Sequence, residues 1–404
     1  MDYELLLNEV MNIGKEMIKS GAETDRAEDS MYRMLESYDV EQCSIFAIQS
    51  DIQATIKPAE GSFITQIRRV HKIGLNYDRL DYLNNLSRYI CKNKPDIREI
   101  HEKYEEVMNR RPQPLYLKYL SAILGGIGFG VYFGCDLMDS LAGTVICAIC
   151  IVYMGNVLEK KGYNLVVYNL SLAFLSSAAV FILDKAGMGH HPDRIVLGLN
   201  MVLISGLGVA NGIRDVLKQA FLSGLLSIVN SFLGAVAIAC GTGLAMVLFE
   251  GEMYEMYIAP SIWVQFISCG VASMGFALLF QAAVKQSFFA GIGGMVNCGC
   301  YLLVQNLNGN NFAAVMAGAA FVAAYAYIMS RVHRAPATIF LTTSIMLVIP
   351  GATLFYMMHG FVQADYGLAR EQTITLAQTC LAIAFGFLIV EIVTRQMTGK
   401  RQQS

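Results

Sequence analysis

Charged side chains become scarce after Pro112 of this 404-residue chain. The first 112 residues hold 36 of the 62 Asp, Glu, Lys and Arg side chains, and the other 292 residues hold only 26. Charged residues make up 15% of the whole chain, whereas a soluble domain has about 25%. Long apolar runs lie between the few later charges, which excludes an ordinary soluble fold for that part. The sequence therefore predicts a small soluble domain followed by a polytopic membrane domain.

Several signals of other protein classes are also missing. There is no basic stripe, RNA-binding motif or zinc-finger spacing, so we expect no nucleic-acid partner. The segment Met1 to Val10 is acidic and has no apolar stretch of the signal-peptide type, so we expect no cleaved signal. Cys298 and Cys300 are separated by one residue, which is not a structural zinc spacing. No nucleophile elbow or telling Cys/His pair is present, so we expect neither an enzyme nor a cofactor or metal site.

Residues 1–112 show the patterns of an α/β domain. Apolar residues recur at helical spacing from Leu6 to Met17, and Gly21 is expected to end that helix. A second helix is predicted around Met31 to Tyr38, after which the period changes to two. The predicted strands are Cys43–Ile48, Ile52–Ile56 and Phe63–Val70, and the later helices are Asp78–Lys92 and Asp96–Asn109. Arg110 to Pro114 is the predicted linker.

Ten apolar stretches follow the linker. At about 1.5 Å per residue each is long enough to cross a hydrocarbon core of about 30 Å. The predicted spans are 116–134, 138–156, 166–183, 195–211, 220–248, 258–281, 287–305, 312–330, 336–357 and 373–394. They form a first half over 116–248 and a second half over 258–395, with a cytosolic tail over 396–404. Within the first span, Gly126 to Gly130 has the glycine spacing of closely packed membrane helices.

Positive residues segregate to one side of these spans. If residues 1–112 are cytoplasmic, ten Lys and Arg fall in the inner loops and tail, against three in the outer loops. The inner set is Lys160, Lys161, Arg214, Lys218, Lys285, Arg331, Arg334, Arg395, Lys400 and Arg401, and the outer set is Lys185, Arg194 and Arg370. Cytoplasmic loops of membrane proteins carry the excess of Lys and Arg, so both termini are predicted to be cytoplasmic.

The ten spans divide into two sets of five, and the fourth span of each set contains a helix-breaking pair. These pairs are Ser205-Gly206 and Pro350-Gly351. A repeat unit with an odd number of crossings places its two copies in opposite orientations. Inverted repeats with interrupted helices in matching positions point to the binding site of a secondary transporter, since freed backbone groups can line a polar cavity. The alternative is that these Gly and Pro residues only permit close packing.

Four passages resemble the threonine/serine exporter family. They are Gly21 to Asp29, Asn76-Tyr-Asp-Arg-Leu80, Asp193 through Asn211-Gly-Ile-Arg-Asp215, and Val348-Ile-Pro-Gly351. The passages lie in both halves, so the chain resembles the fused form of this family. It differs from the family pattern at Ser205-Gly206, Ala210-Asn211 and Lys218-Gln219, where the family usually has Pro-Gly, Thr-Asn and Gly-Asp.

The resemblance implies an inner-membrane exporter of small polar metabolites that uses the proton motive force. Threonine and serine are the substrates after which the family is named, and some two-chain relatives handle succinate. A dicarboxylate substrate therefore stays open as an alternative. From a different class, an uncoupled channel or a membrane receptor built on the same cavity also stays open, and so does a homo-oligomer.

Arg214 and Asp215 are candidate substrate-handling residues after the fourth span. An Arg can bind a carboxylate in a fork geometry, and an Asp within a membrane domain can carry a proton or bind an ammonium group. The alternative is an interfacial ion pair that anchors the helix.

Neutral polar side chains inside the spans are further candidates for a translocation path. A zwitterion needs several uncharged hydrogen-bond partners, although each such side chain can also serve only as an interhelical hydrogen bond of about 0.6 kcal/mol. The candidates are Asn211, Asn230, Gln265, Asn297 and Gln378, together with the break residues Ser205, Gly206, Pro350 and Gly351.

Four charged residues of the first domain are candidates for a regulatory or docking face. They are Glu23, Arg26, Glu28 and Asp29 on the predicted second helix. The alternative is a plain solvated face with no partner.

Overall fold

The computed structural model describes residues 2–402 apart from 60, 72–73, 137–138, 140, 142, 144, 147–148, 150–151, 153–156, 159–163, 188–190, 204–205, 218, 250–259 and 347. The chain divides into two compact units. Unit 1 comprises Met1–Gln113 with the short segments Phe280–Ala283 and Met329–Ile339. Unit 2 comprises Pro114–Leu279, Val284–Ile328 and Phe340–Ser404.

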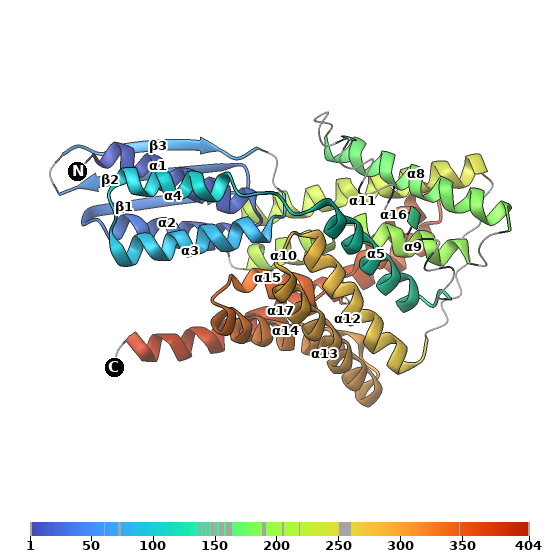
Figure 1. Ribbon diagram of the computed structural model, residues 1–404. Coiled ribbons are helices and arrows are strands. Elements are labelled where there is room, and N and C mark those ends of the chain that lie inside the picture. The colour runs from blue at the N-terminus through green and yellow to red at the C-terminus, as the bar shows by residue number, and fades with distance from the viewer. Residues whose placement is uncertain are drawn as a thin grey trace. The chain divides into compact units, whose positions relative to one another are not determined.

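Unit 1 combines four helices with a three-stranded antiparallel sheet in the order β1-β2-β3 (Figure 1). The predicted elements are all present, with bounds that differ by a few residues. The helices are α1 (Tyr3–Lys19), α2 (Thr24–Glu36), α3 (Tyr77–Asn93) and α4 (Ile97–Met108), and the strands are β1 (Val40–Ile48), β2 (Asp51–Pro58) and β3 (Ile64–Arg69).

The core of unit 1 lies between one face of the sheet and its helices. On β2, Ile52, Ala54 and Ile56 are fully buried because alternate residues of a strand share one face. Helix α1 packs against β2 and β3, and α2 packs against β1. On the opposite face Phe46 and Ile67 are more than half exposed. The period-two pattern in the sequence therefore reflects a sheet with one buried face.

The start of α3 explains why unit 1 includes Phe280–Ala283. The first N–H groups of a helix have no partner inside the helix. Here the Tyr77 N–H donates to the Phe280 carbonyl at 2.9 Å, and the Asp78 N–H donates to the Gln281 carbonyl at 3.0 Å. The buried Tyr77 ring also meets the Phe280 ring edge to face, with centroids 5.8 Å apart. No pattern in the sequence predicts this long-range contact.

Unit 2 is helical in its described part (Figure 1). The helices that correspond to predicted spans are α5 (Leu115–Tyr132), α8 (Leu165–Lys185), α9 (Pro192–Leu203), α10 (Gly206–Leu217), α11 (Phe221–Phe249), α12 (Ile262–Leu279), α13 (Val284–Asn308), α14 (Asn311–His333), α15 (Ala337–Ser344), α16 (Gly351–Val362) and α17 (Tyr366–Gln402). The predicted span 138–156 lies mostly outside the described residues.

Seven of these helices are long and apolar enough to cross a membrane, and the bent pair α9 and α10 makes an eighth if it counts as one span. The chain is therefore a polytopic helical membrane protein. Predicted span 336–357 is divided into α15 and α16, and neither part reaches the length of a crossing.

Close contacts between α5 and α12 depend on glycine. A Cβ added at Gly275 would lie 2.3 Å from the Gly125 nitrogen, and one at Gly128 would lie 2.5 Å from the Ala272 nitrogen. Gly198 of α9 meets Gly130 in the same manner, since its added Cβ would lie 3.2 Å from the Gly130 nitrogen. Small residues let membrane helices approach closely. The packing role predicted for the glycines from Gly126 to Gly130 is therefore confirmed for Gly128 and Gly130.

Candidate functional site

The first helix break separates α9 from α10. Helix α9 ends at Leu203 and α10 begins at Gly206, and the two axes are bent by 46°. Ser205, predicted to be part of this break, lies outside the described residues. The described helices on either side are therefore bent relative to each other across the sequence position of the Ser-Gly pair.

The second break separates α15 from α16 and contains the predicted Pro350. Helix α15 ends at Ser344, and α16 begins at Gly351. Pro350 has no N–H and disfavours helical geometry in the residue before it. Tight turns replace the helical bonds, with the Val348 N–H donating to the Ile345 carbonyl at 3.0 Å and the Gly351 N–H to the Ile349 carbonyl at 2.7 Å.

One apolar cluster joins the two breaks. Ala210, just after the first break, lies in the same buried cluster as Ile345 and Val348 of the second break. Residues of α14 and α17 complete this cluster, among them Phe387. Helix α10 packs against α11 and α17, and α16 packs against α17 and α11. Two segments far apart in the sequence therefore pack together close to their helix interruptions.

Arg214 and Asp215 lie on α10, close to the first break. Arg214 is only 5% exposed, and its guanidinium lies 3.6 Å from an Asp215 carboxylate oxygen. The same guanidinium lies 5.7 Å from the centre of the Phe387 ring on α17, within cation–π range. A buried charge in a membrane domain is costly and is kept where it is paired or functional. The structure thus places a charged pair beside the cluster that joins the breaks.

Asn211 shares one face of α10 with this pair, because residues three and four apart are neighbours on a helix. Its side-chain oxygen is buried and has no hydrogen-bond partner among the described residues. An amide oxygen in this state can accept a hydrogen bond from an ammonium or hydroxyl group. Together, Asn211, Arg214 and Asp215 offer an acceptor, a cation and a carboxylate within about one helical turn.

Asn297 of α13 supports the second break. It is fully buried, and its Nδ2 donates to the Ser344 carbonyl at 3.1 Å. Ser344 is the last residue of α15, so Asn297 satisfies a carbonyl that the interruption frees. The Ser344 hydroxyl in turn donates to the Ala290 carbonyl at 3.2 Å. Asn297 therefore holds α15 to α13 through the end of the broken helix.

Three other sequence candidates do not join this region. Gln265 donates to the Pro260 carbonyl at 2.7 Å in the first turn of α12. Asn230 on α11 and Gln378 on α17 are exposed on the surface of unit 2. Helical periodicity alone did not separate the exposed Asn230 and Gln378 from the buried Asn297.

A second buried polar cluster lies beside α9. The Asn200 amide and the Ser177 hydroxyl both donate to Thr242 Oγ1, at 3.1 Å and 3.3 Å. The Asn200 oxygen has no partner among the described residues. Asn200 precedes Gly206 by six positions in the sequence. This nearness to the helix-breaking pair could have identified Asn200 as a site candidate from the sequence alone.

The four charged candidates of unit 1 face different ways. Glu28 accepts a hydrogen bond from the Ala47 N–H of β1, and its burial raises the pKa of its carboxyl group. Asp29 pairs with Arg33 at 3.0 Å, and Arg26 is exposed beside it. Glu23 stands directly before α2. They do not form the single face that the sequence suggested, because Glu28 serves the fold of unit 1.

Comparison with known proteins agrees with the resemblance in the sequence. A family model described as "Putative threonine/serine exporter" matches residues 9–249, and a second, described as "Threonine/Serine exporter, ThrE", matches residues 265–393. A Mycobacterium tuberculosis protein named "Probable threonine/serine exporter" is 21% identical over 412 residues, which cover 96% of this chain and 76% of the relative. No solved structure matches the chain. The chain belongs to the threonine/serine exporter family.

Proposed function

We propose that this protein is a secondary active exporter of threonine- and serine-type amino acids. In this proposal it works by proton-coupled alternating access around the two broken helices. The observation that carries the proposal is the reciprocal packing of the breaks. Helix α10 contacts α17 of the other half, and α16 contacts α11 of the other half. If each helix is replaced by its counterpart in the other half, the contact between α10 and α17 becomes the contact between α16 and α11. This is the relation expected of an inverted repeat.

The proposed topology has ten spans, with residues 1–112 and the tail 396–404 in the cytoplasm. Each half, 116–248 and 258–395, contributes five crossings in opposite orientations. The ten-against-three distribution of Lys and Arg supports this orientation. This count takes α15 and α16 together as one interrupted span, and it treats α9 and α10 in the same way.

The chemistry of α10 suits a zwitterion. The Arg214 guanidinium offers parallel N–H donors to a substrate carboxylate. Asp215 offers a carboxylate that holds either the substrate ammonium or a proton, which is how competition between the two couples their movements. Asn211 offers a neutral acceptor on the same face. At the other break, the amide of Asn297 keeps the end of α15 in place.

The test is efflux from proteoliposomes loaded with labelled threonine, serine or succinate, with and without a pH gradient. Export of threonine and serine that rises with the gradient supports the proposal. Succinate efflux in place of amino-acid efflux would move the substrate to the dicarboxylate class. Flux of either substrate that ignores the gradient would favour an uncoupled channel.

A further inference from the structure

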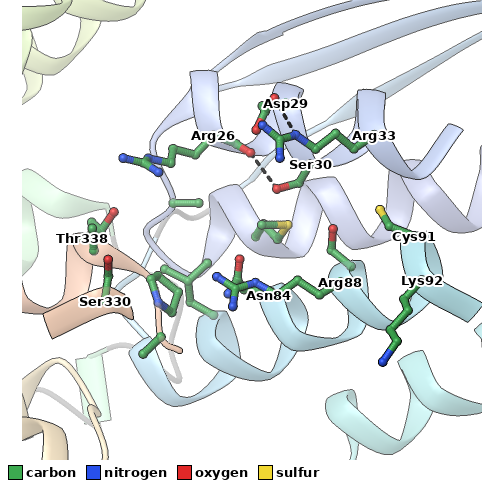
Figure 2. Close-up of a pocket in the computed structure, with 17 residues that line it drawn as sticks. Arg26, Asp29, Ser30, Arg33, Asn84, Arg88, Cys91, Lys92, Ser330 and Thr338 are labelled. Carbon is green, nitrogen blue, oxygen red and sulfur yellow. Dashed lines mark hydrogen bonds and ion pairs between the residues drawn. The ribbon is translucent and has the colours of Figure 1, made fainter. Parts of the chain in front are cut away.

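A cavity of about 480 Å³ lies entirely within unit 1. Helix α2 and helix α3 supply its two long walls, and the segment Ser330 to Thr338 supplies a third side (Figure 2). Met17 and Leu80 contribute buried apolar surface to it. Its volume falls within the range of about 300–1,000 Å³ that is usual for small-molecule sites.

Cations dominate the polar lining of this cavity. Among the described residues, the lining contains four cations and one carboxylate. The cations are Arg26, Arg33, Arg88 and Lys92, and the carboxylate is Asp29. Asp29 pairs with Arg33, whereas Arg26, Arg88 and Lys92 form no ion pair with any described residue. Three cations around one small cavity repel one another, so an anion between them would be stabilised.

Neutral donors accompany these cations. The Asn84 amide nitrogen is buried at the cavity and has no hydrogen-bond partner among the described residues. A buried donor without a partner is destabilising, and a bound acceptor would remove that destabilisation. Ser330 and Thr338 add two hydroxyl groups to the cavity lining (Figure 2). The cavity therefore presents donors and cations from three segments of the chain.

Two helical stripes build the cavity. Asn84, Arg88 and Lys92 are spaced by four residues on α3, so they share one face. Arg26 and Ser30 have the same spacing on α2, where the Ser30 hydroxyl donates to the Arg26 carbonyl at 2.8 Å. The two stripes become one site only because α2 and α3 pack against each other.

We propose that this cavity binds a small polyanion of the phosphate-ester or phosphoanhydride class. Guanidinium groups bind phosphate oxygens through paired N–H donors, and the lysine adds a point charge. The bound anion would connect α2 and α3 to Ser330–Thr338, the connection that leads into broken helix α15. Ligand binding in unit 1 would then be able to bias the position of that connection. Arg26 thereby receives a small-molecule partner in place of a protein docking face.

The test uses the full-length protein in detergent at low ionic strength, titrated calorimetrically with inorganic pyrophosphate. We expect saturable binding at one site per chain. Arg26→Gln and Arg88→Gln should each weaken it about tenfold, the effect of losing one charge-assisted hydrogen bond. Arg98→Gln makes the same charge change at an exposed position of α4 outside the cavity and should leave the affinity unchanged.

Absence of pyrophosphate binding to the wild-type chain would overturn the proposal, as would equal losses in Arg26→Gln and Arg98→Gln. Tighter binding of citrate than of pyrophosphate would overturn the phosphate assignment. Hydrogen exchange provides a second readout on the same samples. Pyrophosphate should slow exchange in α2, in α3 and in residues 330–338 together, and unchanged exchange in all three segments would contradict the site. Because both arginines are exposed, their variants should retain the wild-type exchange pattern without ligand.

Discussion

Unit 1 and unit 2 place their charges in different ways. The first 112 residues carry most of the charged side chains of the chain, and most of these are exposed or half-buried. Even buried Glu16 of unit 1 has partly exposed partners, with Lys19 at 2.9 Å and Arg79 at 3.7 Å. In unit 2, Arg214 is buried and its neighbour Asp215 is partly buried, close to a helix break.

This difference follows from the solvent of each unit. Exposed ion pairs in water contribute about 0–1 kcal/mol, so charges can be numerous there without a specific role. In a membrane domain each charge is expensive, and those that persist mark pathways or partners. The few charges of unit 2 are therefore more informative about transport than the many charges of unit 1. The predictions below test that contrast, beginning with the largest expected effect.

Asp215→Asn should reduce export at least about 100-fold. Removal of the carboxylate beside buried Arg214 costs roughly 3 kcal/mol, and the Asn side chain can no longer carry a proton. The measurement is threonine efflux from cells with matched amounts of membrane-inserted protein. Asp365→Asn is the control, because that exposed residue caps α17 and Asn caps a helix equally well. Normal efflux from Asp215→Asn would contradict a role for this carboxylate.

Arg214→Lys should raise the substrate concentration for half-maximal export about tenfold. Lysine keeps the positive charge but loses the planar fork that matches a carboxylate. Concentration-dependent efflux in proteoliposomes measures the effect, and exposed Arg370→Lys provides the control. An unchanged half-maximal concentration would indicate that Arg214 only balances the charge of Asp215.

Asn297→Leu should lower the export rate by several-fold to about tenfold. Leucine has a similar volume but leaves the Ser344 carbonyl without its donor, at a cost of about 1–3 kcal/mol. Asn230→Leu and Gln378→Leu alter exposed amides and should retain nearly wild-type export. Equal losses in all three variants would mean that burial does not distinguish the path from the outer surface.

Substitutions at Glu28 should have the smallest effect and leave export unchanged. Glu28→Ala removes the acceptor of the Ala47 N–H and should destabilise unit 1 locally by about 1 kcal/mol, whereas Glu28→Gln keeps an acceptor oxygen. Exchange of the Ala47 amide in the full-length protein measures both variants. A loss of export with normal Ala47 protection would give Glu28 a functional role.

The same position has a predictable pH dependence. Burial raises the pKa of Glu28 in the folded state, so its protonation stabilises unit 1 at low pH, and that stabilisation is lost as pH rises through the folded pKa. Since Gln does not titrate, Ala47 protection in Glu28→Gln should improve relative to wild type as pH rises through that range. A constant ratio across the range would contradict a raised pKa at Glu28.

The sequence predicted the secondary structure of unit 1 and the position of the helix break at Pro350-Gly351. Period-two and helical patterns located β1 to β3 and α1 to α4, because each element buries one face. Pro350 and the adjacent Gly351 located the second break because proline cannot donate a backbone hydrogen bond. The candidate site was predicted less well, since the sequence does not show whether a polar side chain in an apolar helix points inward or outward. Asn297 is buried, whereas Asn230 is exposed.

The sequence by itself determined that this protein has a charged N-terminal part, a long apolar part and the helix-breaking residue pairs Ser205-Gly206 and Pro350-Gly351. These are local properties, set by composition, period and the backbone limits of Gly and Pro. The tertiary structure alone decided that Ala210 and Val348 share a cluster, that Tyr77 meets Phe280, and that Arg26 and Arg88 line one cavity. Such contacts depend on packing between distant segments, which local periodicity does not encode.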